Sequence, residues 1–126
     1  MESPIDPINL KIINGLKIYV PAKDFDVSKR FYAGLGFELS EAWGGSFDCR
    51  LWAAVFRLQD YYVKDWANNF MMQFEVEDAR AWYVHAKHLI DSGGFGDARV
   101  SEPEEIAGSL ITHVHDPSGV LLIFIQ

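Results

Sequence analysis

Apolar and polar positions alternate along most of this chain, and two stretches depart from the alternation to follow helical spacing. The alternation predicts strands over residues 12–20, 37–43, 47–53, 55–59, 70–76, 100–105, 110–115 and 120–125. Helix-capping aspartates precede the other two stretches, so we expect one helix to begin at Asp24 or Asp26 and another at Asp78. The order of one strand, one helix and three strands occurs twice, which indicates an internal duplication.

The duplicated pattern predicts a single α+β domain, residues 1–126, that is built from two tandem βαβββ modules. We place the first module at residues 11–59, a linker at 60–69 and the second module at 70–126, with an arm over residues 1–10. Two faint sequence matches support the duplication. Residues 17–24 match 71–78 at an offset of 54, and residues 55–59 match 122–126 at an offset of 67.

Composition narrows the class of protein. The chain is 49% hydrophobic and 14% aromatic, which is enough for a sizeable core. Its net charge of −7 argues against nucleic acid and against anionic membranes as partners. Cys49 is the single cysteine, so no disulfide can form within the chain, and a reducing cytoplasm is the simplest location. No apolar run approaches the roughly 20 residues of a membrane-spanning helix.

Several short motifs occur in a fixed order. Residues 24–32 read D-x-x-x-S-x-x-F-Y, and L-G-F follows at residues 35–37. V-E-D at residues 76–78 opens the second helix, and a D-P-S-G turn at residues 116–119 separates the last two strands. Together these motifs resemble the vicinal-oxygen-chelate superfamily of glyoxalases, extradiol dioxygenases and bleomycin-resistance proteins. The resemblance implies two βαβββ modules that form a curved mixed sheet around a cavity.

The resemblance also implies four matching points at which metal-using relatives hold their ion, on the first and last strands of each module. In this chain those points are Lys17, Phe56, Met71 and Ile123. None of these side chains is an ordinary ligand for a divalent ion. A slip of one residue in the fourth strand would place Arg57 at the point of Phe56, which suits a cation no better. We therefore expect neither a metal nor another cofactor.

Histidines are the remaining candidates for metal ligands. His113 and His115 alternate on one predicted strand, so both side chains point to the same face and could bind a transition metal. His85 and His88 lie three residues apart on the second helix. Structural or hydrogen-bonding roles are the simpler interpretation for all four. The thiol of Cys49 lies next to a carboxylate, which disfavours an activated nucleophile.

Strand alternation separates core positions from cavity positions. The positions expected under the helices are Leu16, Ile18 and Val20 on the first strand and Met72, Phe74 and Val76 on the fifth. By resemblance, the opposite faces line the cavity. The predicted ligand-binding residues are Lys17, Tyr19, Trp43, Arg50, Trp52, Phe56, Trp66, Met71, Gln73, Glu75, His113 and Ile123. This wall is mainly apolar and aromatic, which is typical of a binding cavity rather than of a hydrolytic or redox site.

The function predicted from these features is metal-independent binding of a small hydrophobic or aromatic molecule, such as an antibiotic. Bleomycin-resistance relatives resemble the chain in lacking the metal ligands, and they are usually dimers, so we expect a homodimer. An alternative is an enzyme of the superfamily, a glyoxalase-like lyase or isomerase or a dioxygenase. It would use a non-standard site at Lys17, Glu75 or the two strand histidines. A third interpretation is an interaction role, with the cavity filled by the protein's own side chains.

Overall fold

The computed structural model describes residues 9–126, so most of the predicted arm lies outside the described part. Its strands are β1 (Tyr19–Pro21), β2 (Glu38–Glu41), β3 (Phe47–Leu51), β4 (Ala54–Gln59), β5 (Met71–Glu75), β6 (Arg99–Val100), β7 (Glu104–Ile106), β8 (Ser109–His115) and β9 (Leu121–Ile125). Its helices are α1 (Phe25–Leu35), α2 (Lys64–Asn68) and α3 (Ala79–Asp91), with short 3-10 turns at Asn9–Lys11 and Trp43–Gly45. None of these described helices is long and apolar enough to cross a membrane.

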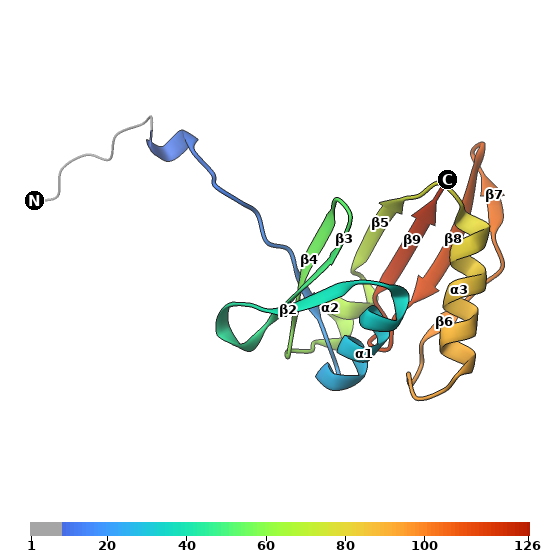
Figure 1. The fold of residues 1–126 in the computed structure, drawn as a ribbon, viewed down its shortest axis with the longest axis horizontal. Helices are drawn as coiled ribbons and strands as arrows, with labels where there is room; N and C mark the ends of the chain where they lie inside the picture. Colours follow the sequence, from blue (N-terminus) through green and yellow to red (C-terminus); the bar gives the residue numbers. More distant parts are fainter. Residues whose placement is uncertain (1–8) are drawn as a thin grey trace, which may run out of the picture.

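Two mixed sheets form the body of the protein (Figure 1). The first has the strand order β1-β4-β3-β2, and the second has the order β5-β9-β8-β6, with β7 also paired to β8. In each sheet the first strand of the module runs parallel to the last, and the other pairs are antiparallel. The α+β fold class and the duplicated βαβββ pattern are therefore confirmed.

Local sequence explains where the two long helices begin and how closely they approach. The carboxylate of Asp24 accepts a hydrogen bond from the backbone N–H of Val27 at 3.1 Å, and Asp78 caps α3 in the same way at 3.0 Å. The helices meet at Gly34 of α1, where a Cβ atom would lie 2.5 Å from the side chain of Leu89. A residue without a side chain at this position therefore lets α1 and α3 pack closely.

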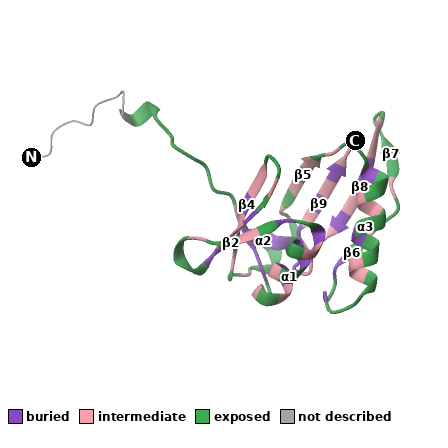
Figure 2. Cartoon of the chain, viewed as in Figure 1, coloured by how far each residue is buried: buried purple, intermediate pink, exposed green. Residues whose placement is uncertain are grey.

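One continuous hydrophobic core joins the two modules. Phe31 and Tyr32 of α1 and Phe56 of β4 are buried, and they belong to the same cluster as Leu122 and Phe124 of β9. The rings of Tyr32 and Phe56 meet edge to face, with 4.9 Å between their centroids. Figure 2 shows this burial along the central strands, while α3 turns an exposed side outward. Phe56 therefore lies in the core, and its predicted place in the cavity wall is wrong.

The first strand is shorter than the alternation predicts. β1 begins at Tyr19, and residues 12–18 form no regular structure and run away from the sheets (Figure 1). Of this segment only Tyr19–Pro21 pair with β4, and the carbonyl oxygen of Ile18 accepts one further bond from the N–H of Arg57, so residues 12–17 have no neighbouring strand in the described part of the chain. Leu16 is 74% exposed and Ile18 is 44% exposed, so their predicted place under the helices is wrong. Val20 is fully buried, as expected.

Three further boundaries differ from the prediction. The predicted linker contains helix α2. The strand predicted at residues 100–105 is divided into β6 and β7, because Pro103 lacks the backbone N–H that would continue the ladder. The strand predicted at residues 37–43 ends at Glu41, and a turn follows in which Gly44 and Gly45 take φ values of 68° and 78°. On β5, the side chains expected in the core are partly buried and pack against it, as predicted.

Candidate functional site

The first sheet carries charged side chains on the face turned away from the core, which we call its open face. Along β4, Phe56 and Leu58 point into the core, so Arg57 between them points to the open face. Nε of Arg57 donates a hydrogen bond to Oδ1 of Asp48, its partner on β3, at 2.8 Å. Nζ of Lys17 lies 3.4 Å from the other carboxylate oxygen. The carboxylate of Asp48 therefore holds two cations together.

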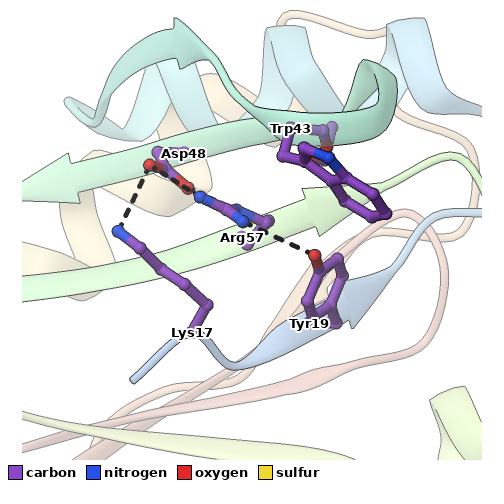
Figure 3. Close-up of polar contacts among 6 residues, drawn as sticks. Lys17, Tyr19, Trp43, Asp48 and Arg57 are labelled. Carbon is purple, nitrogen blue, oxygen red and sulfur yellow. Dashed lines mark hydrogen bonds and ion pairs between the residues drawn. The ribbon is translucent and has the colours of Figure 1, made fainter. Parts of the chain in front are cut away.

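Tyr19 completes this group, and we call Lys17, Tyr19, Asp48 and Arg57 the Arg57 cluster (Figure 3). Nη1 of Arg57 donates to the Tyr19 hydroxyl at 3.5 Å, and the guanidinium carbon lies 5.7 Å from the ring centroid. The hydrogen bond from Arg57 lowers the pKa of Asp48, and the bonds to Asp48 and Tyr19 raise the pKa of Arg57. At neutral pH the cluster therefore contains two cations and one carboxylate.

Trp43 presents a flat apolar surface next to the Arg57 cluster. Its side chain is 79% exposed, and it lies in the turn between β2 and β3. The hydroxyl of Ser46 donates to the carbonyl oxygen of Trp43, which holds the turn in place. Figure 3 shows the indole pointing toward Arg57 and Tyr19. An exposed indole beside an anchored guanidinium is suited to stack against a planar molecule.

Strand pairing shows which residue of β4 matches Ile123 of β9. Tyr19 pairs with Arg57 in the first sheet, and Gln73 pairs with Ile123 in the second. Tyr19 and Gln73 are 54 residues apart, the same offset that relates the beginnings of the two modules. Arg57 rather than Phe56 therefore occupies the matching point on the last strand of the first module. The last strands of the two modules are related by an offset of 66, not 67.

The open face of the second sheet combines apolar and polar side chains and holds five of the predicted site residues. Met71 on β5 is 62% exposed, and Ile123 on the neighbouring strand β9 is partly exposed. Gln73 and Glu75 follow Met71 at alternate positions, so they share its face and are exposed. His113 on β8 pairs with Ile123 and lies on the same face. The alternation predicted from sequence is therefore the alternation of the structure at these positions.

The histidines of β8 and the single cysteine do not form an obvious reactive centre. Nδ1 of His113 lies 3.6 Å from a carboxylate oxygen of Glu104. Burial, with Arg99 and His113 nearby, lowers the pKa of His115. Burial also raises the pKa of the Cys49 thiol to about 12, which leaves it protonated and unreactive at neutral pH. Across residues 9–126, no three His, Cys, Asp or Glu side chains gather in a group that could hold a metal ion.

A groove of about 1030 Å³ lies between the two modules. Its lining comes from the hairpin between β3 and β4, from the end of β5 and from the start of α3. Trp52, at the tip of that hairpin, is 93% exposed. Gln73 and Glu75 line the groove as well, because β5 is an edge strand of its sheet. The structure thus separates Trp52 from Trp43, although both were predicted as walls of one cavity.

Two other predicted residues have separate positions. The ring of Trp66 packs against those of Tyr61 and Phe70, at centroid distances of 6.3 Å and 6.0 Å, so it fixes the linker. Arg50 is exposed on β3, on the same face as Asp48. Within one chain the predicted residues are therefore divided among the two open faces, the groove, the linker and the core.

Asp48 is the site residue that the sequence pattern did not predict. The β3–β4 hairpin turns at Trp52 and Ala53, so residues pair when their numbers add to 105, as in Asp48 with Arg57. If the turn had been recognised in the sequence, the pairing rule would have placed Asp48 and Arg57, with opposite charges, opposite each other on one face. The turn contains neither glycine nor asparagine, so the usual sequence signal for a two-residue hairpin is missing.

Solved structures of other proteins superpose on this chain, whereas no family model and no curated protein matches it. A bleomycin resistance determinant encoded on the transposon Tn5 gives a TM-score of 0.74 at 24% identity, covering 90% of this chain and 98% of that chain. A bleomycin-binding protein complexed with bleomycin gives 0.72 at 24% identity with the same coverage. The bleomycin-binding protein from bleomycin-producing Streptomyces verticillus, complexed with copper(II)-bleomycin, gives 0.71 at 19% identity and covers 90% and 97%.

These similarities establish the fold. The chain has the fold of the bleomycin-resistance proteins, which a glyoxalase/bleomycin resistance protein and an antibiotic-binding protein from Streptomyces also share. The structural resemblance predicted from the sequence motifs is therefore confirmed over 90% of the chain. Fold alone does not identify a ligand, so what this chain binds must be argued from its own side chains.

Proposed function

We propose that this protein binds and sequesters a small, planar, partly aromatic molecule, such as an antibiotic, without a metal ion. The observation that carries the proposal is the exposed indole of Trp43, which points toward Arg57 and Tyr19 of the Arg57 cluster (Figure 3). Asp48 and Tyr19 hold the guanidinium of Arg57 in place, so a ring stacked on the indole gains a fixed polar neighbour at little cost in entropy. Proteins of the same fold whose structures contain bleomycin support this class of ligand.

The side chains at the four matching points support binding without a metal. Lys17, just before β1, and Arg57 on β4 occupy two of these points, and Met71 and Ile123 occupy the other two in the second sheet. A divalent ion there would meet two positive charges and two side chains that offer no lone pair of ordinary strength. The same positions suit an organic molecule with an anionic or polar edge and an apolar body.

We further propose that a second copy of the chain completes the cavity. Neither the groove between the modules nor a polar pocket at the β8–β9 turn is lined by Lys17, Arg57 or Met71. The side chains of Leu10, Ile12, Ile13 and Leu16 are 66%, 61%, 83% and 74% exposed. Exposed apolar surface of this extent is typical of an interface between chains. A two-fold homodimer would cover this segment and bring an open face of one copy against the other.

The test is isothermal titration calorimetry with bleomycin, in metal-free and copper(II) forms, followed by a panel of planar aromatic antibiotics. We expect saturable binding that prior treatment of the protein with EDTA leaves unchanged. Trp43→Ala should weaken binding about five- to tenfold, because aromatic stacking contributes roughly 1 kcal/mol or more. Trp52→Ala is the matched control, since it removes an equally exposed indole that lies outside the Arg57 cluster.

Three outcomes would contradict the proposal. One is that no compound of the panel binds. Another is that Trp52→Ala abolishes binding while Trp43→Ala does not, which would place the ligand in the groove instead of on the open face. The third is a stoichiometric metal ion in protein purified without chelator, whose removal also removes ligand binding.

A further inference from the structure

We propose that the groove between the modules is a second binding site, which takes a planar aromatic cation. The groove does not include Trp43 or any member of the Arg57 cluster, so this inference does not depend on the function proposed above. Its volume of about 1030 Å³ exceeds what a tricyclic molecule needs. Three parts of its lining favour this class of ligand: an aromatic floor, a rim that contains carboxylates, and the tip of the β3–β4 hairpin, which we call the lip.

The floor of the groove is a set of nearly parallel aromatic rings. Trp82 of α3 stacks on Phe124 with 4.4 Å between centroids and an angle of 14° between planes. Phe74 of β5 stacks on Phe124 with 5.2 Å and 19°. Phe124 is almost completely buried, but Phe74 and Trp82 are only partly buried and line the groove. A planar ligand can extend this arrangement without displacing any of its members.

The rim of the groove is negatively charged. The exposed carboxylates of Glu75 and Glu77 line it, and none of the residues that form it is a lysine or an arginine. His85 is the one other titratable lining residue, and its Nε2 lies within hydrogen-bonding distance, 3.1 Å, of the carbonyl oxygen of Leu35. Aromatic faces and carboxylates both attract cations, and the net charge of −7 adds a favourable long-range field. The groove therefore discriminates in favour of positive charge.

The lip, at the tip of the β3–β4 hairpin, has a backbone conformation that is unfavourable for the residue it contains, Trp52. Trp52 has a φ of 53°, in the left-handed region that glycine or asparagine adopts at lower cost. Its side chain is also 93% exposed, so the chain gains no burial from it. The neighbouring Ala53 and Ala54 are too small to fill the groove that they line. A large aromatic residue at such a position is explained by contact with a ligand, not by stability of the hairpin.

The experiment is a fluorescence titration of the full chain with proflavine, a planar tricyclic cation, and with acridone, an uncharged tricycle of similar shape. Proflavine should bind at least tenfold more tightly than acridone. Trp52→Gly should weaken proflavine binding about tenfold while the melting temperature stays equal or rises, because glycine relieves the positive φ. Proflavine stacked on Trp43 would add a second signal, so the titration is repeated in Trp43→Ala, where the tenfold loss caused by Trp52→Gly should persist and separate this site from the open face.

The carboxylates give an independent test. Glu75→Gln and Glu77→Gln should each weaken proflavine binding about threefold, which is the scale of one exposed charge pair. Glu38→Gln is the matched control, because Glu38 is an exposed carboxylate on β2 outside the groove. Equal affinities for proflavine and acridone, or full binding by Trp52→Gly, would overturn the proposal. Proflavine affinity that falls as the protein concentration rises would also overturn it, since a second copy would then cover the groove.

Discussion

A short, buried hydrogen bond connects the two modules, and its removal gives the most specific prediction. The hydroxyl of Tyr32 on α1 donates to Oδ2 of Asp116, in the turn before β9, at 2.6 Å. Both side chains are fully buried. Oδ1 of Asp116 accepts bonds from the backbone N–H groups of Ser118 and Val120, at 2.8 Å and 3.0 Å. Tyr32→Phe therefore deletes one donor and leaves the turn itself intact.

The pH dependence of this contact follows from the burial of Asp116. Burial raises the pKa of this carboxyl to about 6, although the hydrogen bonds from Tyr32 and the turn lower it. Burial also raises the pKa of Tyr32, so its hydroxyl stays a neutral donor. In the unfolded chain an aspartate titrates near 3.9. Between pH 4 and pH 6 the folded chain keeps a proton that the unfolded chain has lost, so stability falls by about 2 kcal/mol over this range, and by about 3 kcal/mol over the complete titration.

Tyr32→Phe should therefore cost different amounts at two pH values. At pH 8 the carboxylate of Asp116 is charged and loses a charged hydrogen bond, so we expect about 2 kcal/mol. At pH 5 the carboxyl of the folded chain is mainly protonated, and the lost bond is between neutral groups, so we expect about 1 kcal/mol or less. The cost of the substitution thus grows as pH rises.

Urea denaturation of wild type, Tyr32→Phe and Asp116→Asn at pH 5 and pH 8 provides the measurement. Asp116→Asn is nearly isosteric and cannot titrate, so it should remove about 1.4 kcal/mol of the difference in stability between pH 5 and pH 8, because only about one pH unit of the shifted titration lies above pH 5. The other titratable groups are common to all three proteins, so they cancel in the comparison. Equal costs of Tyr32→Phe at both pH values would refute the reasoning, because the pH dependence would then have another source.

Two further predictions concern the open faces and the assembly. Phe74→Ala should reduce the free energy of unfolding by about 3 kcal/mol, since Phe74 stacks on Phe124 beside the core. The side chain of Met71 is 62% exposed, so Met71→Ala should reduce it by less than about 1 kcal/mol. Thermal melts with equal or reversed losses would mean that the face assignment of β5 is wrong. Sedimentation at micromolar concentration should give a dimer, and the double substitution Ile13→Glu with Leu16→Glu should give the 14.3 kDa monomer; a monomeric wild type would exclude the dimer.

Alternation along single strands is the part of this protein that its sequence specifies most directly. Tyr19, Gln73 and Ile123 lie on the open faces, and Val20 lies in the core, as the pattern predicts. The reason is that side-chain direction reverses at every residue of a strand, so one buried position determines its neighbours. No information about other strands is needed for that step.

Relations between strands were harder to predict, because they depend on turns. The match of residues 55–59 with 122–126 relied on apolar similarity, and it slipped by one residue. Neighbouring core and surface positions of these strands carry side chains of similar polarity, so shifting the match by one residue changes its quality little. The true register depends on the turn at Trp52 and Ala53. This turn has an unusual sequence, because the positive φ falls on Trp52 instead of on a glycine or an asparagine. The Asp48–Arg57 pair was missed for the same reason.

The first strand shows a limit of a different kind. Residues 12–18 have the β-branched and apolar composition of a strand, yet residues 12–17 form no strand pairing with the described part of the chain. A strand needs a neighbour as well as a suitable sequence, and composition does not say where the neighbour comes from. The proposed second copy would supply that neighbour, so the sequence pattern and the exposed segment agree if the functional unit is a dimer.

The two open faces differ in a way that constrains the ligand. The face of the first sheet presents the anchored cations of the Arg57 cluster and the indole of Trp43, whereas the face of the second presents Met71 and Ile123 with Gln73, Glu75 and His113 and carries no lysine or arginine among these positions. A cavity between two such walls would bind an amphipathic molecule in one orientation, with its polar edge toward Arg57 and its apolar body toward Met71. Reversing the molecule would bury a polar edge against apolar side chains and leave Arg57 facing an apolar body. Under the proposed function, the difference between the modules at the four matching points would therefore orient the ligand, and the same side chains are not ordinary ligands for a divalent ion.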